Sequence, residues 1–124
     1  SANARTFIIA ENWINILVKS PVFPLPAKLS HGEIFVSSNS ADNYSELILY
    51  SLSGKIVQRI PATCNGCSYN ISSNGDKQRI FRWNLRSIDR NPVSPGIYLY
   101  SIKQENGNNK SKQLERGKIA IIGK

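Results

Sequence analysis

The pair Cys64 and Cys67 is the part of the chain whose residue types and spacing best suit chemistry. Two cysteines separated by two residues match the redox dithiol motif, in which a helix N-terminus at the first cysteine lowers the thiol pKa. The residues that follow, 68–72, have the pattern of a strand and a loop, so the sequence does not predict the helix that this chemistry needs. Two interpretations stay open: a disulfide that clamps a turn, which would indicate an oxidising compartment, and a pair of free thiols.

The other candidate catalytic side chains are poorly placed for catalysis or metal binding. His31 is the single histidine, and it lies beside Gly32 in a polar turn without further ligands at the spacing of a metal site. Asp76 and Asp89 fall in separate loops, so no pair of acids is set up for glycoside hydrolysis. The chain also lacks a glycine-rich phosphate loop and a nucleophile elbow. We therefore expect no catalytic residue, no metal and no cofactor.

The chain is strongly basic. Its 16 Lys and Arg residues against 8 Asp and Glu residues give a formal net charge of +8. The densest run comprises Lys110, Lys112, Arg116 and Lys118, interrupted by Glu115. These cations could simply keep strand faces and loops soluble, or they could attract a polyanion such as nucleic acid, lipopolysaccharide or an acidic glycan. No aromatic residues suited to base stacking are interleaved with them, which argues against a nucleic-acid partner.

We expect the chain to be a piece of a longer protein. Residues 1–4 resemble a remnant of expression cloning, and they lack the charged start and apolar stretch of a signal peptide. No run of 18 apolar residues occurs, so no transmembrane segment is predicted. The predicted division is residues 1–4 as the remnant, residues 5–20 as an N-terminal strand and linker from the parent protein, and residues 21–124 as one C-terminal domain.

Short apolar runs separated by Pro, Gly, Asn and Ser predict an all-β fold. No window keeps a helical apolar period for three turns, and the β-rich runs recur at fairly regular spacing. The expected fold class is an immunoglobulin-like antiparallel β-sandwich of about seven to nine short strands. The predicted strands span residues 7–10, 13–18, 34–37, 47–51, 55–60, 68–71, 80–85, 97–103 and 118–122.

Turn residues and side-chain alternation predict a hairpin and a core. Gly54 tolerates the positive φ of a tight turn, so it is expected to join the two strands between residues 47 and 60. Pro21, Pro24 and Pro26 cannot sit in a central strand and mark an extended segment that leads into the sandwich. The expected core residues are Leu47, Leu49, Ile56, Trp83, Ile97, Leu99, Ile119 and Ile121.

Four segments follow one another in a specific order along the chain. The first is a proline-flanked segment at residues 22–27 (VFPLPA), and the second is an apolar hairpin at residues 49–57 (LYSLSGKIV). The third is a turn and strand at residues 94–100 (SPGIYLY), and the fourth is a lysine-bearing terminal strand at residues 117–124 (GKIAIIGK). Together they resemble the C-terminal sorting domain of the type IX secretion system, which occurs on secreted proteins of Bacteroidota.

The resemblance implies a domain that does no chemistry of its own. Members of the family carry a cargo across the outer membrane as a folded signal; a surface peptidase then removes the domain and links the cargo to an anionic lipopolysaccharide. The implied partners are the outer-membrane secretion machinery, its surface peptidase and that lipopolysaccharide, with cleavage within residues 5–20. The implied location is secreted, at the outer membrane or cell surface, by way of the periplasm. The recognition residues that the motifs suggest are Pro24, Pro26, Gly54, Gly96, Tyr98, Lys118 and Lys124.

Two other functions stay open. Residues 80–84 (IFRWN), followed by residues 94–98, are similar to an immunoglobulin-like module of flagellar hook-capping proteins. That likeness implies a structural adhesion or spacer module in a larger surface protein. The other alternative is a glycan-binding module, for which Tyr44, Tyr69 and Trp13 are the candidate aromatic residues.

Overall fold

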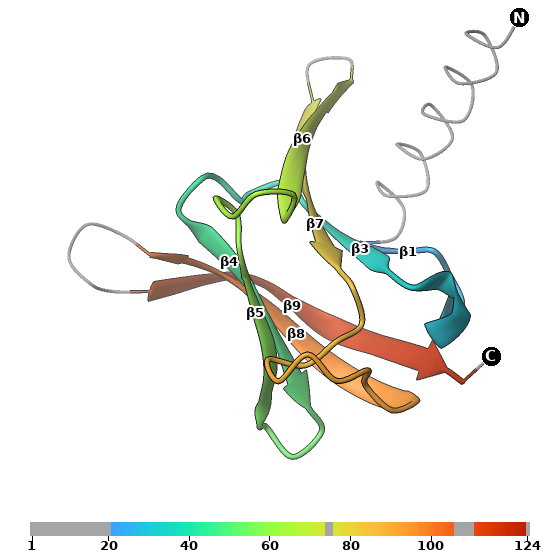
Figure 1. Ribbon diagram of the computed structural model, residues 1–124. Coiled ribbons are helices and arrows are strands. Elements are labelled where there is room, and N and C mark those ends of the chain that lie inside the picture. Colours follow the sequence, from blue (N-terminus) through green and yellow to red (C-terminus); the bar gives the residue numbers. More distant parts are fainter. Residues whose placement is uncertain (1–20, 74–75, 106–110, 124) are drawn as a thin grey trace, which may run out of the picture.

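The structure is a computed structural model, and it describes residues 21–73, 76–105 and 111–123 of the chain. Within these residues the fold consists of strands and one short 3₁₀ helix, η1 (Leu29–His31) (Figure 1). The strands are β1 (Val22–Phe23), β2 (Ala27–Lys28), β3 (Ile34–Ser38), β4 (Ser45–Ser51), β5 (Ile56–Pro61), β6 (Ser68–Ser73), β7 (Asp76–Trp83), β8 (Gly96–Glu105) and β9 (Ser111–Ile122). No helix in the described ranges is long and apolar enough to cross a membrane.

The strands form two sheets. One has the order β1-β3-β7-β6 and the other the order β2-β9-β8-β4-β5. Neighbouring strands of the described chain are antiparallel, except that β2 and β9 are parallel. The predicted all-β sandwich is therefore confirmed, with one parallel pair that a purely antiparallel prediction did not include.

The proline-rich segment is where the chain crosses from one sheet to the other. β1 pairs with β3 in the four-stranded sheet, and β2 pairs with β9 in the five-stranded sheet. Pro24 and Pro26 lie between β1 and β2, and each follows a cis peptide bond. Because proline has no N–H to give to a strand ladder, it suits the step between two sheet edges. Because of this crossing, β2, near the start of the described chain, lies beside β9, the last strand.

Side chains from the facing surfaces of both sheets form one core. Alternate residues of a strand point to opposite faces, so each strand gives the core every second side chain. Leu47, Leu49, Trp83, Ile119 and Ile121, five of the predicted core residues, are buried as expected. The buried cluster comprises Val22, Ala27, Ile34, Val36, Leu47, Leu49, Ile60, Ala62, Phe81, Trp83, Leu85, Val93, Tyr100, Ile102, Ile119 and Ile121.

Three predicted core residues belong to the outer face of the five-stranded sheet instead. Ile56 is 39% exposed and Ile97 is 47% exposed, so their assignment to the core was wrong. A register shift after Leu49 sets Ile56 opposite Tyr50 on that outer face. In β8 it is Tyr98, Tyr100 and Ile102 that point inward, which turns Ile97 and the half-buried Leu99 outward.

The last strand is much longer than the sequence predicted. β9 begins at Ser111, whereas the prediction began at Lys118, because β9 pairs with β8 as far as Glu105. The far end of this hairpin projects beyond the sandwich (Figure 1). Its polar sequence lacks the apolar alternation that would have indicated a strand. The predicted strands at residues 7–10 and 13–18 lie outside the described residues.

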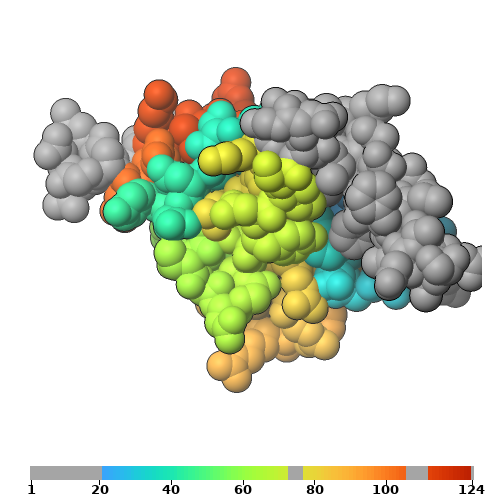
Figure 2. Space-filling model, turned by 90° about the horizontal axis from the view of Figure 1, so that it is seen from above, coloured from blue at the N-terminus to red at the C-terminus, as the bar shows by residue number. Residues whose placement is uncertain are grey.

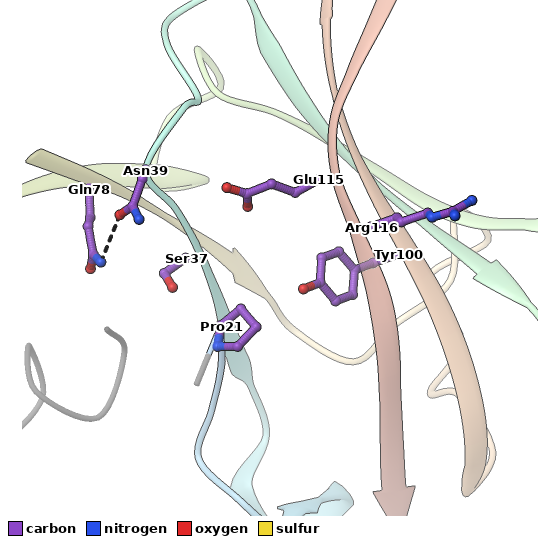
Figure 3. Close-up of a pocket in the computed structure, with 7 residues that line it drawn as sticks. All are labelled: Pro21, Ser37, Asn39, Gln78, Tyr100, Glu115 and Arg116. Carbon is purple, nitrogen blue, oxygen red and sulfur yellow. Dashed lines mark hydrogen bonds between the residues drawn. The ribbon is translucent and has the colours of Figure 1, made fainter. Parts of the chain in front are cut away.

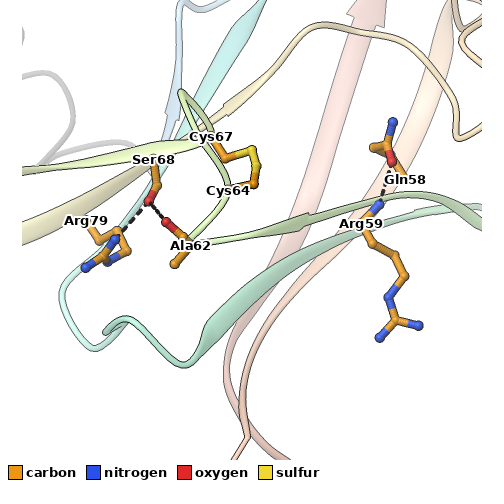
Figure 4. The surroundings of a disulfide bond; sticks show 7 residues. All are labelled: Gln58, Arg59, Ala62, Cys64, Cys67, Ser68 and Arg79. Carbon is orange, nitrogen blue, oxygen red and sulfur yellow. Dashed lines mark hydrogen bonds between the residues drawn. A yellow bond between two sulfur atoms is a disulfide. The ribbon is translucent and has the colours of Figure 1, made fainter.

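Cys64 and Cys67 form a disulfide in the turn between β5 and β6, with their Cα atoms 5.3 Å apart (Figure 4). β6 follows directly, so the structure places a strand, and not a helix, after the second cysteine. The turn and β6 lie together on one face of the molecule (Figure 2, yellow-green). Closing a loop this short stabilises the fold by about 2 kcal/mol in the chain-entropy model.

A buried arginine connects this turn to the sandwich. Arg79 is 7% exposed, and its Nη1 donates a hydrogen bond of 2.8 Å to Ser68 Oγ. Ser68 Oγ in turn donates to the Ala62 carbonyl at 2.7 Å (Figure 4), and Arg79 Nη2 donates to Asn43 Oδ1 at 2.6 Å. These bonds fix the position of the turn relative to β7.

Candidate recognition site at the end of the five-stranded sheet

Segments that are far apart in the sequence meet at one end of the five-stranded sheet. Ile121 of β9 lies between Ala27 of β2 and Gly96 of β8. Ser51, at the end of β4, lies opposite Tyr98, so the Gly54 turn is at this same end. All four segments that resemble the sorting-domain family therefore converge here.

The turn that leads into β8 is anchored to the core. The Tyr98 hydroxyl donates a hydrogen bond of 2.5 Å to the Ser94 carbonyl, and the Tyr98 ring meets Trp83 edge-on with 5.8 Å between ring centroids. Burial raises the pKa of Tyr98. Gly96 has a φ of 148°, a conformation that L side chains rarely adopt. Tyr98 and Gly96 thus shape this end of the sheet, with Tyr98 partly buried against the core and Gly96 exposed.

An apolar strip crosses the outer face at this end of the sheet. We call it the sheet-end surface. The strand pairing places Ile97 opposite Ala120 and sets Leu99 between Tyr50 and Lys118. Ile97 is 47% exposed and Ile122 is 46% exposed. The sheet-end surface comprises Tyr50, Ile56, Ile97, Leu99, Ala120 and Ile122, with Lys118 beside them. A strip of exposed and half-buried apolar side chains next to a cation is typical of a surface that binds another molecule.

The other candidate recognition residues are distributed around this end. Pro26 is exposed ahead of β2, Gly54 is exposed at the tip of the β4–β5 turn, and Pro24 is partly buried. Lys118 is exposed on the outer face of β9. Lys124 lies outside the described residues. Ile97 was assigned to the core from the sequence and Ile122 was not singled out, so both were missed as exposed candidates.

Gly117 lets the last strand lie close against the core. It is paired with Tyr100, and a Cβ at residue 117 would lie 2.6 Å from Cε1 of the Tyr100 ring. A real side chain there would push the buried ring away, so glycine is required for this contact. The Tyr100 ring therefore packs directly against the β9 backbone.

The residues weighed for catalysis or metal binding remain apart. The His31 Nδ1 accepts a hydrogen bond of 3.2 Å from the Lys28 backbone N–H, which closes η1. Asp76 begins β7, a strand rather than the predicted loop, and Asp89 lies in the loop after it. No group of three His, Cys, Asp or Glu residues within the described residues is placed to hold a metal ion.

The aromatic residues weighed for glycan binding do not form a row. Tyr44 is 73% exposed ahead of β4, in the five-stranded sheet. Tyr69 lies on β6 of the other sheet, where its ring meets Phe35 edge-on at 6.4 Å. Trp13 lies outside the described residues. Tyr44 thus lies in the turn before β4 and Tyr69 on β6, and among the described residues no ring contact joins the two.

No family model and no curated protein matches the chain. Among solved structures, the chain is similar to dimeric latent PorU from Porphyromonas gingivalis, with 14% identity and a TM-score of 0.60, over 83% of this chain and 9% of that one. PorZ of Porphyromonas gingivalis, described as an essential surface component of the type IX secretion system, gives 17% identity and a TM-score of 0.48, over 82% of this chain and 11% of that one. Chitinase ChiW from Paenibacillus sp. str. FPU-7 gives 18% identity and a TM-score of 0.48, over 83% of this chain and 8% of that one. At such identities the likeness to PorU concerns the fold alone, and the chain spans about a tenth of that protein's length.

Proposed function

We propose that this chain is a non-catalytic C-terminal sorting domain, which directs a larger cargo protein across the outer membrane to the cell surface through a type IX secretion system. The observation that carries the proposal is the convergence of the four family-like segments at one end of one sheet. The strand pairing that builds the sheet brings these segments together. A partner that binds this end of the sheet could therefore contact all four of them.

The sandwich would act as a rigid support for this signal. β2, β8 and β9 are paired at the sheet end, and Ile121 of β9 is buried beneath the outer face. The apolar strip supplies the area for binding, while Lys118 supplies a charge that gives orientation and specificity. The proposed partners are the outer-membrane machinery and its surface peptidase, with lipopolysaccharide as the anchor for the released cargo.

Export of a reporter tests the proposal. Residues 5–124 would be fused to the C-terminus of a fluorescent protein that carries a Sec signal, in a Bacteroidota host with and without a working type IX system. We expect the reporter at the surface or in the medium only in the working strain. Equal periplasmic retention in both strains would contradict the proposal and favour the structural spacer module. Equal export from both strains would also contradict it, since the route would then be independent of the system.

A further inference from the structure

One side of the last strand is open for most of its length. β9 has 12 residues and pairs with β8 over almost all of them. On its other side β2 covers only Ile121 and Ile122. Among the described strands, none pairs with residues 112–120 on that side. Proteins usually protect such edges, since their free N–H and C=O groups can pair with another chain.

A cavity of about 220 Å³, lined mostly by residues with polar side chains, lies between the two sheets beside this open edge (Figure 3). The four-stranded sheet and the segments next to it contribute one wall, and β8 and β9 contribute the other. Its lining residues are Pro21, Ser37, Asn39, Gln78, Tyr100, Glu115 and Arg116. The volume suits one side chain or a similarly small group, because sites for drug-sized ligands begin at about 300 Å³.

The cavity offers hydrogen-bond acceptors that lack donors. Gln78 is 7% exposed; its Nε2 donates to Asn39 Oδ1 at 2.9 Å, but its Oε1 has no hydrogen-bond partner within the described residues. The ion pairs of the described chain join Arg59 to Glu46 and Arg82 to Glu33, so neither involves Glu115. Gln78 Oε1 is itself shielded from solvent, so the half-buried Glu115 carboxylate is the group with which a cationic side chain in the cavity would pair.

The two faces of the open edge differ in charge. Glu115 lies opposite the buried Ile102 and therefore on the inner face, with its carboxylate toward the cavity (Figure 3). Burial raises the pKa of Tyr100, and the nearby Glu115 carboxylate raises it further. Arg116 points away from the cavity, and Arg116 and Lys118 are exposed on the outer face. The edge is thus acidic on its inner side and basic on its outer side.

We propose that the open edge of β9 binds an extended peptide of a partner protein as an added strand. A Lys or Arg side chain of that peptide enters the cavity beside Glu115 and Gln78, and its Asp or Glu side chains lie against Arg116 and Lys118. Backbone pairing gives such complexes affinity, and pockets for alternate side chains give them specificity. A second copy of β9 is disfavoured, because it would bring its own Arg116 and Lys118 to the same cations. The site would serve the sorting role proposed above, but its test does not depend on export.

A symmetrical synthetic peptide tests the site. In the heptapeptide EVEKEVE the central lysine faces inward and every glutamate outward, whichever way the strand runs. The control peptide KVEEEVE has the same composition and net charge but exchanges the central lysine with the first glutamate, so that a glutamate faces inward at the centre. Using the full chain and labelled peptides, we expect fluorescence anisotropy to show at least about tenfold tighter binding of EVEKEVE, as one charge-assisted pair would give. Hydrogen exchange should then show slower exchange of the amides of residues 112–120 when this peptide is bound.

Matched variants assign the effect to the cavity. Glu115→Gln should weaken EVEKEVE binding about tenfold and remove the preference over the control peptide. Glu105→Gln, an exposed carboxylate near the end of β8, should leave both affinities unchanged. Equal affinity for the two peptides, no binding of either, or protection away from β9 would overturn the proposal. A dimer that forms through this edge, seen by analytical ultracentrifugation, would overturn it as well.

Discussion

Deletion of residues 118–124 should unfold the domain. It removes Ile119 and Ile121, which are 1% and 4% exposed, and it takes away the strand with which β2 pairs. Losing one buried isoleucine side chain costs about 2 to 5 kcal/mol, so two approach the whole stability of a typical small domain, about 5 to 15 kcal/mol. Circular dichroism during thermal unfolding should show no cooperative transition. The single variant Lys118→Ala, on the exposed outer face, should unfold like the native chain.

If the deletion variant still unfolded cooperatively, with a thermal midpoint near that of the native chain, this account of β9 would be contradicted. The result also matters for functional work. The C-terminal strand is both the candidate signal and part of the core, so loss of export after its deletion would not separate recognition from folding. Substitutions of exposed side chains are needed for that purpose.

Trp83→Ala should produce the largest loss of stability of any single substitution in the four-stranded sheet. Trp83 is fully buried, its ring packs edge-on against Tyr98, and its Nε1 donates a hydrogen bond of 3.0 Å to the Arg86 carbonyl. Replacing such a residue with alanine costs about 3 to 5 kcal/mol through lost burial and the cavity left behind. Urea unfolding should show a decrease of that size in the free energy of unfolding. Lys77 is exposed on the same strand, so the control Lys77→Ala should change the free energy of unfolding by less than about 0.5 kcal/mol.

An intermediate variant separates the two contributions of Trp83. Trp83→Phe keeps most of the apolar volume but removes one of the two donors to the Arg86 carbonyl, the other being Gln58 Nε2 at 3.3 Å, so we expect a smaller loss than for alanine. If Trp83→Ala cost no more than Lys77→Ala, the ring would not be the centre of the core, and the packing described here would be wrong.

Local sequence patterns were sufficient for the fold class but not for the face of each strand. Proline, glycine and β-rich runs marked the strands, and Gly54 marked the β4–β5 turn, where its φ is 90°. In β8, however, apolar residues occupy both faces, so alternation could not decide which points inward. The decision came from tertiary packing, since Tyr98 fits against Trp83 and Tyr100 fits over Gly117.

The candidate site was predictable only in its parts. Pro26, Gly96 and Lys118 could be selected by their likeness to family motifs, but their convergence depends on the parallel pairing of β2 with β9. No local pattern predicts a strand of two residues. The cavity residue Glu115 was missed for another reason: it lies in a polar stretch that only its pairing with β8 makes into a strand.

The most direct test of the central claim is export of the reporter when only the sheet-end surface is altered. The double variant Ile97→Thr and Ile122→Thr keeps β-branched residues at two exposed positions and should leave the fold intact, as a native unfolding midpoint would verify. Tyr44→Thr, at a still more exposed residue near the opposite end of the sheet, is the control. We predict that the double variant accumulates in the periplasm of the working strain while the control reaches the surface. Native export of a folded double variant would contradict recognition through this surface.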